Sequence, residues 1–256
     1  MKVVILAGGM GTRMREETEF KPKPMVEVGG IPILKHIMNH YMKFSYRDFV
    51  VCLGYKGGMI RRYFFEYPLM TNDLTLSNVG AMTYHANPLR MEDHFDVTLC
   101  DTGLKANTAE RIWKARRYLG GSTFLCTYGD GLSDVNIQDV VNFHNKHGKL
   151  ATLVAVQPKS RYGVLDFRDS NTVRSFQEKP TSNEWINAGF FVFNAKVAEY
   201  CGDACTPSLE GILRALAEED QLVAYRHHGF FASCDTSKDL TELNELWDKG
   251  DAPWTR

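Results

Sequence analysis

The chain has 256 residues, of which 44% are hydrophobic, and a formal net charge of −1. This length suits one large α/β domain, and the hydrophobic content is enough for a sizeable core. The balanced charge offers no basic surface for nucleic acid or an anionic membrane, so we expect neither as a partner. Six scattered cysteines form no Cys-x-x-Cys pair or zinc cluster, and no apolar run approaches the ~20 residues of a membrane span. Because the first residues already read as a strand, we expect no signal peptide and predict a cytoplasmic protein in a reducing compartment.

A glycine-rich loop follows the first apolar run, residues 3–6, which we expect to be a buried strand. Gly8, Gly9 and Gly11 lack Cβ atoms, so their backbone N–H groups can approach a polyphosphate closely. Successive N–H groups form an anion-binding concavity, and a helix that begins just after would add its positive end. We therefore predict that this loop cradles phosphates.

Two basic residues accompany the loop. Arg13 presents a planar fork of donors that suits phosphate oxygens, and Lys23 presents a compact charge on a backbone stiffened by flanking prolines. A P-loop would need Lys-Ser or Lys-Thr where Thr12-Arg13 stands, and the dinucleotide fingerprint would need glycine where Met14 stands. A plain strand-to-helix turn is the simpler alternative.

These residues resemble the signature of the sugar-1-phosphate nucleotidyltransferases, and within them most closely the glucose-1-phosphate cytidylyltransferases. The resemblance extends over nearly the whole chain, through the stretches 6–13, 21–25, 96–103, 127–131, 175–180 and 253–254. It implies an α/β fold with a Rossmann-like, mixed, mostly parallel sheet flanked by helices, of the GT-A-like kind. It also implies that the loop grips a nucleoside triphosphate through Leu6, Ala7, Gly8, Gly9, Gly11, Thr12, Arg13 and Lys23.

Strand and helix patterns alternate from residue 3 to about residue 67. Apolar residues fall at helical spacing between Ile33 and Tyr41, an apolar run spans 48–53, and Gly57-Gly58 begins a further helix. Such alternation predicts a parallel sheet with helices on both faces.

The helical period disappears after this point. Short β-like pieces with polar turns between them stand at 74–76, 82–85 and 97–100. We therefore predict a single domain over 1–256 with a β-rich insertion at about 70–100. The resemblance implies that an insertion here takes part in subunit contacts, so we expect a homo-oligomer; a surface flap is the simpler alternative.

A helix is expected from 107 to 118, with Thr108 as the candidate cap and Gly120-Gly121 at its end. The family usually has Thr-Gly-Gly-Arg here, in a loop that contacts the nucleotide base. Thr108 and Arg111 match this pattern, whereas Ala109-Glu110 replace the glycines. This departure leaves UTP or dTTP open as alternatives to CTP.

An acidic residue follows the buried strand expected at 123–128. Asp130 stands between two glycines at the carboxyl end of that strand, where parallel sheets bind ligands. A carboxylate that faces a triphosphate needs a cation between them, and Mg²⁺ is the oxygen-seeking ion that fits. The resemblance implies magnesium ligation by Asp130 and Asp235 and nucleotide contact at Gly129. Helix capping by Asp130 is the alternative.

The acceptor is expected to bind to the second half, at about 157–235. Two strands joined by a turn are predicted at 161–167 and 173–176. The residues that the resemblance places against the sugar phosphate are Tyr128, Gly163, Glu178, Lys179, Asn187, Ala188 and Gly189. In this assignment Glu178 accepts hydrogen bonds from sugar hydroxyls and Lys179 holds the phosphate; a solvated charge pair is the alternative. Phe231 and Ser233-Cys234 depart from the residues usual in relatives, so an acceptor other than glucose 1-phosphate stays open.

The rest of the chain is predicted to complete the sheet and its helical layers. The expected elements are a helix to His147, strands at 150–156, 186–193 and 222–225, a helix at 209–219 and a last helix from Thr236. We expect the tail, Pro253-Trp254, to pack against the body.

The reaction implied is transfer of a cytidylyl group from CTP to a sugar 1-phosphate, with glucose 1-phosphate as the expected acceptor and pyrophosphate as the leaving group. The acceptor phosphate can attack in line, so catalysis is positioning and charge neutralisation, by Arg13, Lys23, Asp130 and Lys179. A silent nucleotide-sensing subunit is disfavoured because these residues are present. A glycosyltransferase is disfavoured because Gly129-Asp130-Gly131 is no Asp-x-Asp motif.

Overall fold

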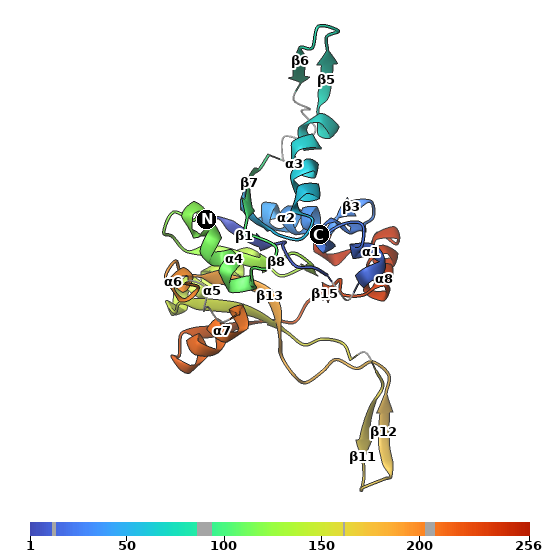
Figure 1. Ribbon diagram of the computed structural model, residues 1–256. Coiled ribbons are helices and arrows are strands. Elements are labelled where there is room, and N and C mark those ends of the chain that lie inside the picture. Colours follow the sequence, from blue (N-terminus) through green and yellow to red (C-terminus); the bar gives the residue numbers. More distant parts are fainter. Residues whose placement is uncertain (12–13, 86–93, 161, 203–207) are drawn as a thin grey trace.

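The computed structural model describes residues 1–11, 14–85, 94–160, 162–202 and 208–256. Its centre is a seven-stranded sheet of order β14-β10-β13-β8-β1-β4-β7 (Figure 1). The strands are β1 (Val3–Leu6), β4 (Asp48–Leu53), β7 (Asp96–Asp101), β8 (Phe124–Tyr128), β10 (Ala151–Val156), β13 (Ile186–Phe193) and β14 (Leu222–His227). Only β13 runs antiparallel to its neighbours, β8 and β10. The sheet is mixed and mostly parallel, which confirms the predicted fold class.

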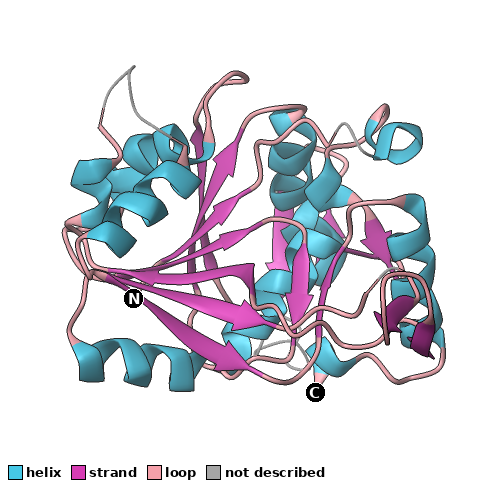
Figure 2. Ribbon diagram, turned by 90° about the horizontal axis from the view of Figure 1, so that it is seen from below, coloured by secondary structure: helices cyan, strands magenta, loops and turns pink. Residues whose placement is uncertain are grey.

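Helices cover both faces of the sheet (Figure 2). The side chains of α2 (Ile33–Lys43), α3 (Gly57–Thr71), α5 (Ile137–His147) and α8 (Ser237–Asp248) join one core cluster. Those of α4 (Thr108–Ala115), α6 (Val197–Tyr200) and α7 (Leu209–Glu218) join the other. Successive strand residues point to opposite faces, so Val3 and Ile5 enter the first cluster and Val4 and Leu6 the second. The uninterrupted apolar run of β1 is thus explained by burial on both faces.

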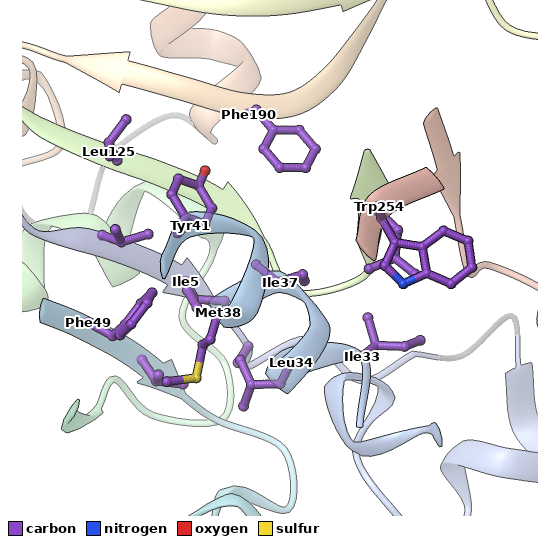
Figure 3. Packing of buried hydrophobic residues seen from close by; sticks show 14 of the residues in the cluster. Ile5, Ile33, Leu34, Ile37, Met38, Tyr41, Phe49, Leu125, Phe190 and Trp254 are labelled. Atoms are coloured by element: carbon purple, nitrogen blue, oxygen red, sulfur yellow. The ribbon is translucent and has the colours of Figure 1, made fainter. Parts of the chain in front are cut away.

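The C-terminal tail lies against α2, with Trp254 on the side of Ile33 (Figure 3). Trp254, in the 3₁₀ turn η5 (Pro253–Thr255), is 1% exposed, and its Nε1 donates to Nδ1 of His36 at 3.2 Å. Its ring lies 5.5 Å from that of Phe230, centroid to centroid. The expected packing of the tail against the body is confirmed.

Short two-stranded sheets surround the main one. They are β2 (Glu27–Val28) with β3 (Ile31–Pro32), β5 (Asp73–Leu76) with β6 (Met82–His85), β9 (Gly131–Ser133) with β15 (Phe231–Ser233), and β11 (Val164–Phe167) with β12 (Val173–Gln177). The short strands expected near 74–76, 82–85, 161–167 and 173–176 are therefore present. The pairs β5–β6 and β11–β12 project from opposite sides of the body as two arms (Figure 1). Every residue of β6, β11 and β12 is exposed.

The described cysteines are free and buried, and Cys52, Cys100 and Cys126 lie in the core as expected. Over the described ranges, no helix combines the length and the apolar character that crossing a bilayer demands. The remaining helices are α1 (Arg15–Thr18) and the 3₁₀ turns η2 (Lys23–Met25) and η4 (Arg116–Tyr118).

Candidate active site

A cavity of about 460 Å³ opens at the carboxyl ends of β1 and β8. These strands are parallel neighbours, and Leu6 lies opposite Tyr128 at their ends. The residues that follow each strand therefore meet at one edge of the sheet, where α/β folds bind ligands. The cavity is lined by Leu6, Ala7, Gly9, Gly11, Lys23, Pro24, Ala106, Asn107, Thr108, Arg111, Tyr128, Gly129, Asp130, Glu210 and Asp235. Most of the predicted nucleotide and metal residues are thus brought together.

Lys23 is the electrostatic centre of the cavity. Its Nζ donates to Oδ2 of Asp130 at 2.6 Å and to Oδ1 of Asp235 at 2.7 Å, and the residue is only 8% exposed. Burial alone lowers the pKa of Lys23, but the charges and hydrogen bonds of the two carboxylates outweigh it and raise the pKa above its usual value. Lys23 is therefore a fully charged ammonium, held between two acidic groups.

A short strand pair brings the two carboxylates together. Asp130 lies between β8 and β9, and Asp235 follows β15. β9 and β15 pair antiparallel, with Gly131 opposite Ser233, and the backbone N–H of Cys234 donates to the carbonyl of Asp130 at 2.9 Å. This pairing explains how residues far apart in the sequence reach one ammonium.

The donor set of this acidic pair suits a hard divalent cation. Asp130 and Asp235 each place one carboxylate oxygen within 2.7 Å of the same Lys23 nitrogen, so both already converge on a single cation. Among the residues described, no group of three or more His, Cys, Asp or Glu side chains could hold a metal. Two carboxylates with substrate phosphates and waters are the coordination that Mg²⁺ uses in phosphoryl-transfer sites.

The backbone of the glycine loop is shaped by close neighbours. Gly11 has φ +61°, in the left-handed region that favours glycine. Gly8 has no room for a side chain, because a Cβ there would overlap the guanidinium of Arg111. Gly9 faces open space within the cavity wall. Thr12 and Arg13 lie outside the described residues, so their predicted phosphate contacts stay predictions.

Arg111 lines the cavity from behind the loop. Its Nη2 donates to the Gly8 carbonyl at 2.9 Å, and its Nη1 donates to the Leu53 carbonyl at 3.0 Å and to Thr102 Oγ1 at 2.5 Å. Burial lowers the pKa of this guanidinium from its usual value. Arg111 thus ties the loop to the ends of β4 and β7, and its predicted contact with the nucleotide stays a prediction.

The structure at the start of α4 corrects the predicted helix cap and explains the presence of Glu110. The cap is Asn107, not Thr108: Asn107 Oδ1 accepts from the Glu110 N–H at 2.9 Å, and Glu110 Oε2 accepts from the Asn107 N–H at 3.1 Å. Thr108 Oγ1 instead accepts from the Leu209 N–H at 3.2 Å. Glu110 therefore completes a capping box, which is a reason for an acidic residue where relatives have glycine.

The predicted acceptor residues divide into two groups. Tyr128 lines the cavity, and its ring leaves no room for a Cβ at Gly189, which would lie 2.5 Å from it. Gly189 has φ +77°, and its N–H donates to Asn187 Oδ1 at 2.8 Å; Ala188 between them is buried. Of these three residues Gly189 lies directly against Tyr128, and none of them is among the residues that line the cavity.

Gly163, Glu178 and Lys179 form the second group, which the structure does not bring to this cavity. They lie at the base of the β11–β12 arm, and Glu178 and Lys179 are exposed. A Cβ at Gly163 would lie 3.2 Å from Glu178 Oε2, so these two residues are neighbours. The predicted sugar and phosphate contacts of this group stay predictions.

Glu210 is a cavity residue that the sequence did not reveal. It stands in the first turn of α7, capped by Ser208, and its Oε1 accepts from the Tyr128 hydroxyl at 3.1 Å. An acidic residue in a first helical turn is ordinary in any helix. Only the bond to Tyr128, which depends on the tertiary fold, distinguishes it.

A phosphate-suited loop, a buried lysine and two convergent carboxylates at the switch point of a mixed sheet define a class of nucleotide-handling protein. The sequence matches the family described as Nucleotidyl transferase over residues 2–248. The chain belongs to this family, and it is an enzyme of the nucleotidyltransferase class.

Two relatives are similar to the chain over nearly its whole length. The chain is 45% identical to the glucose-1-phosphate cytidylyltransferase of Salmonella typhimurium over 262 residues, which cover 99% of this chain and 98% of that protein. The glucose-1-phosphate cytidylyltransferase of Salmonella typhi is likewise 45% identical, with the same coverage.

Solved structures agree on the fold. UDP-glucose pyrophosphorylase complexed with UDP-glucose superimposes with a TM-score of 0.70 at 16% identity, covering 97% of this chain and 98% of its own. HddC from Yersinia pseudotuberculosis gives 0.67 at 22% identity, with 96% and 99% covered.

Proposed function

We propose that the protein transfers a cytidylyl group from CTP to glucose 1-phosphate, giving CDP-glucose and pyrophosphate. The observation that carries the proposal is the Lys23 ammonium, held beside the glycine loop by Asp130 and Asp235. Full-length relatives named for this activity supply the substrates. Ala109-Glu110 stand where glycines were expected, so UTP and dTTP stay open as alternative nucleotides.

The residues act by positioning two anions and neutralising their charge. The acceptor phosphate is itself the nucleophile, so the chain supplies no covalent intermediate. Lys23 would steady the α-phosphate, Arg13 would stabilise the charge that grows on pyrophosphate, and Lys179 would hold the acceptor phosphate. Asp130 and Asp235 would hold Mg²⁺, which when bound supplies positive charge between the phosphates.

The present pairing of Lys23 gives this arrangement a further property. The same two carboxylates that would hold Mg²⁺ now hold the ammonium, at 2.6 and 2.7 Å. Lys23 and these two carboxylates would therefore face the same phosphates, the ammonium as a hydrogen-bond donor and the carboxylates as the groups that would hold the metal.

A homo-oligomer is part of the proposal. A two-stranded hairpin alone is marginally stable in water, yet the β11–β12 arm stands away from the body (Figure 1) and exposes Val164, Phe167 and Phe176 by 48–62%. Contact with a second copy would cover these side chains. It would also bring Glu178 and Lys179, which lie at the base of this arm, toward a cavity. The cytoplasmic location stays a prediction.

A matrix of substrates tests the activity. Each of CTP, UTP, dTTP and GTP is incubated with glucose 1-phosphate, and CTP with other sugar 1-phosphates, and the products are identified by mass. We expect CDP-glucose as the main product. A protein that forms another nucleotide sugar faster, or none, would contradict the proposal.

A further inference from the structure

One more carboxylate, that of the exposed Glu210, lines the cavity. It projects from the start of α7 and accepts from the Tyr128 hydroxyl. Among the residues described, no salt bridge to Glu210 is formed, whereas Asp130 and Asp235 are both ion-paired with Lys23.

The charge state of Glu210 limits what it can bind. Burial raises its pKa, but hydrogen bonds from Ser208, from its own backbone and from Tyr128 outweigh burial, so the pKa lies below its usual value. The Tyr128 hydroxyl donates to this carboxylate at 3.1 Å. An ionised carboxylate only accepts hydrogen bonds, and it repels phosphate. Among the groups that a nucleotide and a sugar phosphate offer, the candidates are therefore their hydroxyl and amino donors.

The location of Glu210 favours one donor among those that the substrates offer. Tyr128, which holds Glu210, also packs against Gly189 of β13. Tyr128, Asp130, Lys23 and Glu210 line the same cavity. In the proposed reaction the acceptor phosphate attacks the α-phosphate that Lys23 would steady, so the hexose lies within one phosphate of Lys23, in the cavity that Tyr128 and Glu210 also line.

We infer that Glu210 recognises the sugar of the acceptor: its carboxylate, which already accepts from Tyr128 through Oε1, accepts a further hydrogen bond from a hexose hydroxyl. This inference rests on the proposed function. It makes Glu210 a specificity residue within the cavity of a single chain, separate from Glu178 on the arm. The ligand class is a hexose 1-phosphate with a hydroxyl directed at α7.

The test compares glucose 1-phosphate with its 2-, 3-, 4- and 6-deoxy analogues in wild type, Glu210→Ala and Glu210→Gln, at saturating CTP. In wild type, one analogue should react with a kcat/KM roughly 10- to 150-fold lower, the range for a hydrogen bond to a charged group. Glu210→Ala should lower kcat/KM for glucose 1-phosphate by a similar factor and leave that analogue nearly unchanged. Glu210→Gln, whose amide oxygen can still accept, should fall between.

Controls separate this role from a structural one and from recognition of the base. Glu218→Gln, on the exposed end of the same helix, should match wild type. CTP affinity and the ratio of CTP to UTP turnover should stay constant in Glu210→Ala. Equal losses on every analogue, a changed CTP to UTP ratio, or no loss would each overturn the inference while the proposed function stands. A wild-type protein that makes no CDP-glucose would overturn both.

Discussion

Among single residues, Lys23 shows how one buried charge organises the site. An ammonium removed from water is stable only when opposite charges replace its hydration, and Asp130 and Asp235 do so at short distances. The raised pKa keeps the group charged throughout the neutral range. The catalytic role that we propose for Lys23 therefore uses a group that the fold already holds in its charged form.

Replacing Lys23 should remove a transition-state stabiliser. We expect Lys23→Ala to lower kcat by about 100-fold or more, the order found when a preorganised charge is lost. Pyrophosphate release measures the change, and Lys249→Ala, at the exposed end of α8, is the matched control. Near-normal turnover in Lys23→Ala would refute the role given to this residue.

The acidic pair should determine how much Mg²⁺ the enzyme needs. Asp130→Asn and Asp235→Asn each remove one charged ligand, so the Mg²⁺ concentration for half-maximal turnover should rise by at least about tenfold. Titration of activity with Mg²⁺ measures it, and Asp248→Asn is the surface control. If the requirement is unchanged, the metal is held elsewhere.

At the scale of elements, strand ends bring the site together, and one backbone conformation in β13 sets the place of Tyr128. Gly189 has φ +77° and lies against the Tyr128 ring. A side chain there is strained by its dihedral and also displaces the ring. Gly148, the cap of α5, has φ +66° but open space around it.

Comparing substitutions at Gly148 and Gly189 separates the effect of backbone strain from the effect of displacing the Tyr128 ring. Gly148→Ala and Gly189→Ala should each destabilise the fold by about 1 kcal/mol or more because of the left-handed backbone. Only Gly189→Ala should also lower kcat/KM for the sugar phosphate, through movement of Tyr128. Thermal unfolding and steady-state kinetics measure both effects. Equal kinetics in the two variants would show that Gly189 does not position the Tyr128 ring.

Buried histidines on α2 and α5 predict the response of stability to pH. Burial lowers the pKa of His40 and of His144 to about 4, from 6.5. Because the folded-state pKa lies below the unfolded value of 6.5, the neutral histidines contribute their full stability above pH 6.5. This stability is lost as the pH falls toward 4. For His40 the loss is about 2 kcal/mol by pH 5. Urea unfolding at pH 7.5, 6 and 5 measures the trend, and constant stability across that range would contradict it.

The sequence predicted local elements well because their signals are local. The apolar run of β1, the spacing in α2 and the Thr236 cap of α8 were all sufficient to predict these elements, and each is present. The cap of α4 was misplaced by one residue because Asn107 and Thr108 are both good caps. Glu210 was missed because its identity as a cavity residue depends on a contact with Tyr128 across 82 positions.

For the whole molecule, the proposal of a homo-oligomer rests on the two arms. Their strands present exposed apolar side chains on hairpins that nothing in the described chain covers. We expect sedimentation to give a species larger than one chain. Replacing residues 164–177 by a short Gly-Ser turn should reduce its size, and an unchanged size would exclude the β11–β12 arm as a contact.

A mixing experiment tests whether the arm serves a neighbour. Lys23→Ala removes the centre of the cavity, and Lys179→Ala alters only the base of the arm. If Lys179 acts on a second copy, co-expression of the two inactive variants should restore part of the activity, because some sites then contain both lysines. No recovery in a co-purified mixture would place Lys179 in the cavity of its own chain.

The pairing of β9 with β15 has a consequence for the newly made protein. Lys23 and Asp235 are separated by 212 positions, and Asp235 reaches the site only when β15 adds to β9. A ribosome-bound chain thus has its glycine loop and first carboxylate long before its second. Premature termination before this strand would yield a fragment unable to assemble the acidic pair, so about the last tenth of translation decides whether both carboxylates can reach Lys23.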